Sequence, residues 1–148
     1  MSEGPQEPVR IGAGATVQMA FACENISTDP VGRLSFQNVI DQLNATQFPA
    51  GTPSFFAVFG FISTTAQHLV QCRVEVMPQR GSQPIAAQQL QDIPFTPDRP
   101  GHRSICGFPG IAWPEPGEYV VRFTTRGQTI ASFPIRVVQV QLPTPPAR

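Results

Sequence analysis

The chain has 148 residues, ten basic and ten acidic residues, and a formal net charge of zero. This length is typical of one domain with a buried core, and the balanced charge excludes the basic surface of a nucleic-acid-binding protein. No apolar run approaches the ~18 residues of a membrane span, and the acidic start MSEGPQEP lacks the basic segment of a signal peptide. We therefore expect one cytoplasmic domain with no nucleic-acid or membrane partner.

The composition favours an all-β fold. The seventeen prolines are about twice the usual share of ~5%, and charged residues make up 14% against the usual ~25%. Turn signals recur between short apolar runs, which is the all-β pattern. We expect a flexible arm over residues 1–14, a β-sandwich over 15–140 and a flexible proline-rich tail over 141–148.

The first two predicted strands cover residues 16–24 and 33–41. The first strand has one face of larger apolar residues, Val17, Met19, Phe21 and Cys23. Its other face carries Ala20 and Ala22 and is small, which predicts close cover by another element. In the second strand Leu34, Phe36 and Ile40 point inward. Asn38 shares their row, and is either a buried, hydrogen-bonded amide or the point where the row bends into solvent.

The next strand, residues 55–62 (FFAVFGFI), is apolar on both faces. One face carries Phe55, Ala57, Phe59 and Phe61, and the other carries Phe56, Val58 and Ile62. Such a run is typical of a strand covered on both sides. A strand in a two-layer sandwich has one covered face, so the second face must meet a loop, a tail or a partner. We therefore predict Phe56, Val58 and Ile62 as a candidate interface.

Three further strands follow. Residues 68–77 alternate well, with Val70, Cys72, Val74 and Val76 inward. Residues 84–93 have some helical propensity, but the run is short and we predict an edge strand. Residues 102–113 form a strand that Gly107-Phe108-Pro109-Gly110 interrupts.

The last two strands, residues 118–125 and 128–138, form a hairpin around Arg126-Gly127. Their apolar rows are Tyr119, Val121 and Phe123, and Ala131, Phe133, Ile135 and Val137. Arginine poorly suits the φ > 0 position of a type I′ turn. We therefore predict a three-residue connection with Gly127 in a G1 bulge, which pairs Tyr119 with Phe133 and Val121 with Ala131.

Two further features belong to this hairpin. Pro134 lies inside its second strand, and because proline cannot donate to the ladder, it predicts an edge position or a bulge. Tyr119 follows the corner Pro114-Glu115-Pro116-Gly117. It is either a tyrosine corner, with its hydroxyl bonded to nearby backbone, or simply a core tyrosine.

The strands together predict an all-β, antiparallel two-sheet β-sandwich of immunoglobulin-like kind with seven or eight strands, and a small closed barrel is the alternative. The segments FACENI, GRLSFQNVIDQL, TQFPAGTPSFFAVFGFI and PGEY occur in this order. Over residues 16–138 the chain resembles a family of small uncharacterised bacterial β-sandwich proteins, a domain of unknown function. The resemblance implies a sandwich fold and a bacterial cytoplasmic origin, and it brings no catalytic residues.

Residues that could support catalysis are few. Cys23, Cys72 and Cys106 each lie in an apolar run and predict buried thiols. His102 and Cys106 share a strand face but lie ~13 Å apart, beyond the ~3 Å that a catalytic base needs; His68 is the other histidine. No metal-ligand spacing or calcium loop occurs in the sequence. We expect no enzyme activity, no cofactor and no metal.

Three functional hypotheses follow. The first is a non-catalytic protein-binding or assembly module, whose partner is another protein or a second copy of the chain. The second is a small-molecule carrier or enzyme with a pocket near Trp113, His102 and Arg103. The third is a structural subunit of a larger bacterial or phage-derived assembly. The C-terminal PTPPAR also matches a PxxPxR polyproline ligand, although its composition favours a disordered tail.

Overall fold

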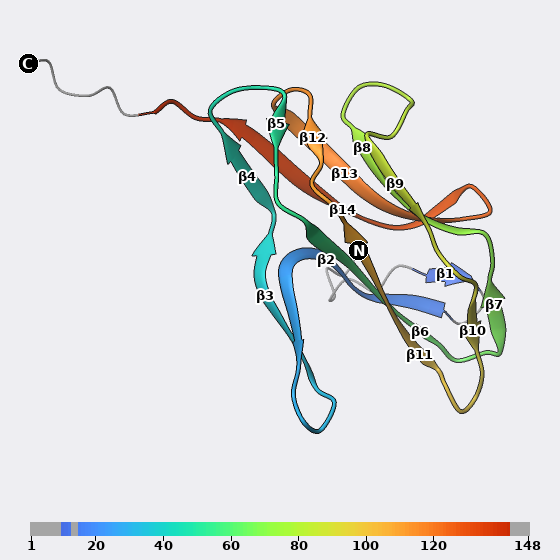
Figure 1. The fold of residues 1–148 in the computed structure, drawn as a ribbon. Helices are drawn as coiled ribbons and strands as arrows, with labels where there is room; N and C mark the ends of the chain where they lie inside the picture. Colours follow the sequence, from blue (N-terminus) through green and yellow to red (C-terminus); the bar gives the residue numbers. More distant parts are fainter. Residues whose placement is uncertain (1–9, 13–14, 143–148) are drawn as a thin grey trace, which may run out of the picture.

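A computed structural model describes residues 10–12 and 15–142 (Figure 1). Within these residues the chain forms fourteen strands and no helix, so no described helix can cross a membrane. The strands are β1 (Arg10–Gly12), β2 (Ala15–Thr28), β3 (Leu34–Ile40), β4 (Gln42–Ala45), β5 (Ala50–Gly51), β6 (Phe55–Ser63), β7 (Gln67–Leu69), β8 (Cys72–Pro78), β9 (Ala86–Gln89), β10 (Ile93–Phe95), β11 (Gly101–Phe108), β12 (Ala112–Trp113), β13 (Gly117–Thr125) and β14 (Gln128–Gln139).

The prediction of an all-β fold is confirmed, but the number of strands is higher than the seven or eight expected. Irregular positions divide several predicted strands. The predicted strand 68–77 is split into β7 and β8 at Gln71, which has a φ of +52°. Within the predicted arm, residues 10–12 form β1 beside β2. The rest of that arm and residues 143–148, including the polyproline-like segment, lie outside the described residues.

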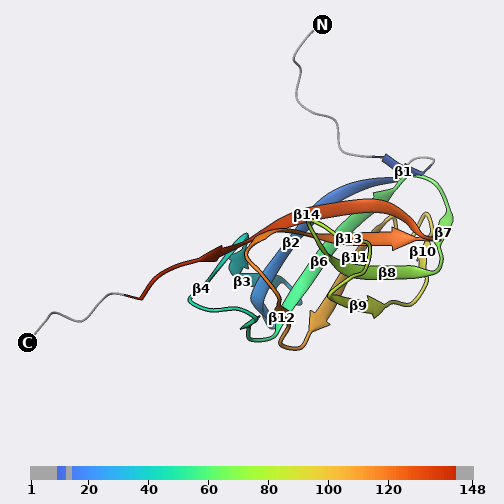
Figure 2. The same ribbon diagram turned by 90° about the horizontal axis from the view of Figure 1, so that it is seen from above.

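Two five-stranded sheets make up most of the domain (Figures 1 and 2). The first sheet has the order β1-β2-β6-β11, with β3 also paired to β2, and the second has the order β4-β14-β13-β8-β9. Asp41 alone separates β3 from β4, so the chain passes from one sheet to the other there. The β4–β14 pair is parallel, which corrects the expectation of purely antiparallel pairing. Two short pairs, β7–β10 and β5–β12, complete the fold.

The two large sheets contact each other through aromatic rings. Phe59 of β6 lies 5.5 Å from Phe123 and 5.4 Å from Phe133, and Phe61 lies 5.0 Å from Phe123, as ring centroids. Each such ring pair stabilises the fold by ~0.5–1.5 kcal/mol beyond the contribution of the apolar area that it buries. Together with their neighbours these rings form one continuous core.

Strand β2 turns its small face to this core, as predicted. Ala22 is fully buried and Ala20 packs against the core cluster. The predicted row of larger residues is divided, because the register with β6 shifts between Val17 and Met19. This bulge turns Val17 towards the core and leaves Met19 on the opposite face.

The hairpin β13–β14 has a different turn from the predicted one. Arg126 and Gly127 have φ values of +52° and +76°, as in a two-residue type I′ turn. Tyr119 therefore pairs with Ile135 and Val121 with Phe133, two residues further along than predicted. The apolar rows still share one face, because a bulge next to Thr129 supplies the extra residue within β14.

Tyr119 forms the tyrosine corner that was one of the two sequence interpretations. Its hydroxyl donates to the Glu115 carbonyl oxygen at 2.6 Å and accepts from the Glu115 backbone N–H at 3.3 Å. The ring is buried edge-on against Trp113, with centroids 4.8 Å apart. The corner therefore ties the start of β13 to the core.

Two edge predictions are confirmed. The Arg136 N–H donates to the Asp41 carbonyl on the β4 side, so the nitrogen of Pro134, two residues earlier, points the same way. Pairing with β4 begins at Arg136, so no strand of the described residues pairs with that side of β14 at Pro134. In the predicted strand 84–93, β9 is the edge strand of the second sheet.

The substitution Tyr119→Phe tests the corner. It removes both hydrogen bonds to Glu115 and keeps the buried ring, so the free energy of unfolding should fall by about 1 kcal/mol. Chemical denaturation with an unchanged m-value would measure this loss. Equal stability of the two proteins would show that the corner bonds contribute nothing.

Candidate functional site

The outer face of the first sheet is the strongest candidate site, because it is where the predicted interface lies. Residues opposite each other on paired strands share a face. The residues of this face therefore form four rows that run across the sheet. The rows are Val39, Cys23, Phe56 and Gly107; Phe21, Val58 and Ile105; Met19, Gly60 and Arg103; and Thr16, Ile62 and Gly101. This set of residues is called the outer face below. Arg103 is its one charged member.

Large side chains on the outer face fill the space that glycines leave. A Cβ on Gly60 would lie 2.6 Å from the Met19 Cγ, so the Met19 side chain lies directly over Gly60. A Cβ on Gly107 would lie 3.5 Å from the Phe56 ring. Apolar side chains of the outer face itself therefore lie over Gly60 and beside Gly107.

The predicted interface residues differ in how far solvent reaches them. Val58 lies between Phe21 and Ile105 and is fully buried, whereas Phe56 and Ile62 are half-buried. The more exposed apolar side chains are Ile105 at 40% and Val39 at 60%. Sequence reasoning did not assign these two to the interface, because only the strand pairing puts them beside Phe56 and Val58.

Strand β3 extends the outer face through an irregular position. Asn38 has a φ of +58°, is exposed and donates its Nδ2 to the Glu24 Oε2 at 3.2 Å. The row therefore bends towards solvent at Asn38, which decides between the two sequence interpretations. Ile40 packs against the core, but the Phe36 ring packs edge-on against Phe21 at 5.0 Å. Phe36 thus enlarges the aromatic surface, and its predicted inward orientation is wrong.

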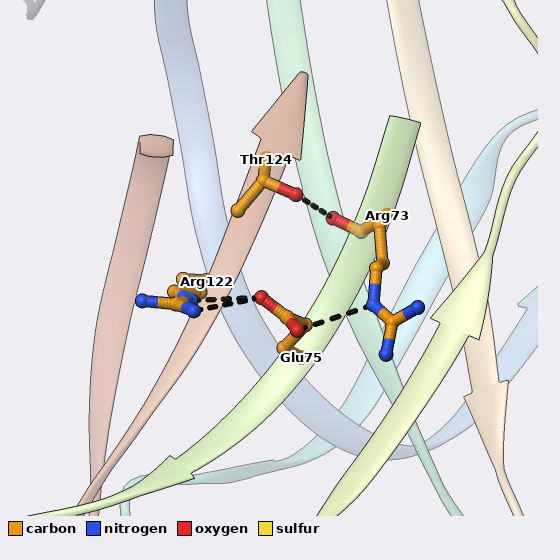
Figure 3. A network of polar contacts seen from close by, with 4 residues as sticks. All are labelled: Arg73, Glu75, Arg122 and Thr124. Carbon is orange, nitrogen blue, oxygen red and sulfur yellow. Dashed lines mark hydrogen bonds and ion pairs between the residues drawn. The ribbon is translucent and has the colours of Figure 1, made fainter. Parts of the chain in front are cut away.

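The outer face of the second sheet has a different chemistry (Figure 3). Glu75 of β8 lies between two arginines: Arg73 Nε donates to one carboxylate oxygen at 3.1 Å, and Arg122 Nε donates to the other at 2.9 Å. The Thr124 hydroxyl donates to the Arg73 carbonyl at 3.4 Å. The charges of Arg73, Glu75 and Arg122 are therefore paired with one another and need no ligand.

The predicted pocket near Trp113, His102 and Arg103 is not a single site. His102 and Arg103 line a shallow groove of about 200 Å³ with Met19 and Gly60. Trp113 packs against Phe55 at the other end of β11, about 20 Å away at ~3.3 Å per residue. It is fully buried, and its Nε1 donates to the Thr52 hydroxyl at 3.0 Å.

The three cysteines are free and buried, as predicted. Burial raises the pKa of the Cys23 and Cys72 thiols and raises that of Cys106 to about 11. Burial also lowers the pKa of His102, which lies on the same inward face of β11 as Cys106. Thiols with raised pKa values are poor nucleophiles. In the described part of the chain no group of three or more His, Cys, Asp or Glu side chains is placed to hold a metal ion.

Cys106 predicts a pH dependence of stability. Its folded pKa of about 11 is above the ordinary thiol value of 9.0, so the unfolded chain loses this proton first as the pH rises. The contribution of the protonated Cys106 thiol to the free energy of unfolding is fully present below pH 9. It declines by about 2 kcal/mol as the pH rises towards 11. Denaturation at pH 8 and pH 10.5 should show a smaller decline for Cys106→Ala than for the wild type. Equal declines would contradict the role of this thiol.

Comparison with known proteins places this all-β domain in a family. The chain belongs to a family of unknown function, DUF6941, whose model matches residues 18–138. The implied membership of an uncharacterised domain family is therefore confirmed. No curated protein matches the sequence.

Several solved structures are similar in part. A Pseudomonas fluorescens alkylpurine DNA glycosylase, AlkC, bound to DNA containing an abasic site analog has a TM-score of 0.48 and 14% identity, covering 86% of this chain and 31% of that chain. A Listeria innocua beta-glucosidase in complex with glucose has a TM-score of 0.41 and 14% identity, covering 86% and 16%. An immunoglobulin-like protein from Pseudomonas aeruginosa has a TM-score of 0.36 and 12% identity, covering 90% and 99%.

The chain thus spans less than a third of the glycosylase and about a sixth of the glucosidase. These likenesses are weak, and the activities of the larger proteins are not transferred to this domain.

Proposed function

We propose that this domain is an immunoglobulin-like β-sandwich that acts as a non-catalytic protein-binding module through the outer face of its first sheet. The observation that carries the proposal is the apolar composition of this face, which holds one charged residue, Arg103, and exposes Val39 and Ile105. A contiguous exposed apolar surface on a folded domain marks an interaction site. Its partner is a protein surface that is itself apolar and weakly charged.

The contrast between the two sheets supports this assignment. On the second sheet Val120 is exposed to 37%, but it lies two residues from Arg122, whose charge is paired with Glu75. On the first sheet Phe21, Phe36 and Phe56 are half-buried next to exposed aliphatic side chains. Aromatic residues are enriched and charged residues are depleted at the centre of protein interfaces.

The hypothesis of a carrier or enzyme has weaker support. The predicted pocket included Trp113, but the interior beside Trp113 is filled by the stacked rings of Phe55 and Phe108. A crevice beside Phe55 and Ile135 has a volume of about 20 Å³, enough for about one water molecule. A drug-sized ligand needs a pocket of ~300–1,000 Å³.

A photocrosslinking amino acid at position 39 tests the proposal in the native cell, and position 120 provides the control on the other sheet. Position 39 should give an adduct with one defined protein, which mass spectrometry identifies, and position 120 should not. The partner is then purified and its Kd measured. Val39→Arg should weaken binding at least tenfold, because it buries an unpaired charge in the interface, and Val120→Arg should leave the Kd unchanged.

Two results would overturn the proposal. One is the absence of any adduct at position 39. The other is an equal effect of Val39→Arg and Val120→Arg on the Kd, which would place the interface elsewhere.

A further inference from the structure

Strand β11 has an open edge. It pairs with β6 on one side, and among the described residues no strand pairs with its other side. The Ser63 N–H donates to the Pro100 carbonyl at 2.7 Å, so in this ladder the even-numbered residues of β11 bond towards β6. The backbone groups of Gly101, Arg103 and Ile105, and likewise Gly107, therefore point away from the sheet. All four residues are exposed.

This edge lacks most of the features that normally prevent strands from pairing. Natural edge strands are protected by proline, charged side chains, bulges or inward-pointing charges. Over its eight residues β11 has one charged side chain, Arg103, contains no proline and pairs with β6 without a register shift. The neighbouring edge strand of the second sheet, β9, has the uncharged sequence AAQQ and lies beside β11 (Figure 2). A second molecule approaching this side meets no opposing charge from β9.

We propose that two copies of the domain pair antiparallel along β11, with the two Ile105 residues opposite each other on a twofold axis. In this register the outward backbone groups of both strands meet as hydrogen-bonded pairs. Arg103 lies opposite Gly107 of the second copy, which has no side chain to clash with it. An axis at Arg103 would instead place two like charges directly opposite each other, which is destabilising.

The side chains support the same register. Ile105, exposed to 40% in the single chain, gains an apolar neighbour across the axis. The outer faces of the two molecules join into one surface, with Val58 next to Ile105 on each side. The pairing concerns the edge of the sheet, so it stands whether or not the outer face binds another protein. Val39, which tests the outer face, lies on β3 beyond β2 and away from this edge.

The oligomeric state tests the pairing. Sedimentation velocity of the full chain at tens of micromolar should give twice the chain mass. Ile105→Pro should raise the dimer dissociation constant at least tenfold, because it removes the N–H at the axis. Since this N–H points to the open edge, the substitution breaks no bond to β6. Ile105→Thr keeps the N–H and the β-branched shape and should remain dimeric.

A disulfide test gives a second readout that does not depend on the proline variant. Opposed Cα atoms in such a pair lie ~5.5 Å apart, within the range for a disulfide. Ile105→Cys should form a covalent dimer on mild oxidation, and Val120→Cys, with similar exposure, should not. The native cysteines are buried and do not interfere. A monomeric wild type, a folded Ile105→Pro that remains dimeric, or no disulfide at position 105 would each overturn the proposal.

Discussion

The fold depends on a strand that is apolar on both faces. The inward side of β6 places Phe59 and Phe61 against the rings of the second sheet, and this contact joins the two sheets into one core. The outward side places Val58 in the middle of the outer face, where it is fully buried. Because β2 and β11 flank β6, the side chains that lie on either side of Val58, Phe21 and Ile105, must also be apolar to keep water from it.

This requirement explains why the two sheets differ on the outside. On the second sheet three outward charged residues of β8 and β13 pair with one another, with Glu75 between Arg73 and Arg122. On the first sheet Met19 and Phe56 lie over the glycines of neighbouring strands and form an apolar layer. Covering that layer with another protein removes apolar area from water, which lowers the free energy. This is the physical basis of the proposed function.

Side-chain alternation along single strands could be predicted from the sequence, and so could features carried by a few adjacent residues. The two faces of β6 and the small alanine face of β2 were of this kind, and the corner of Tyr119 was one of two interpretations. Features that depend on pairing between distant strands could not be predicted. The bulge before Met19 shifts the register between β2 and β6, which no local pattern encodes. Ile105 and Val39 joined the candidate site only through strand pairing. The turn at Arg126 is local, but its prediction was wrong because arginine adopts a φ > 0 conformation that it usually disfavours.

The central claim is that the two faces of β6 have separate roles, the inward face in folding and the outward face in binding. The most direct measurement compares Phe59→Ala with Phe56→Ala, by chemical denaturation and by the Kd for the crosslinked partner. The account predicts that Phe59→Ala lowers the free energy of unfolding by ~3–5 kcal/mol. Phe56→Ala should cost less than half of that and weaken binding at least tenfold. Equal destabilisation by both substitutions, with binding unchanged in Phe56→Ala, would contradict the claim.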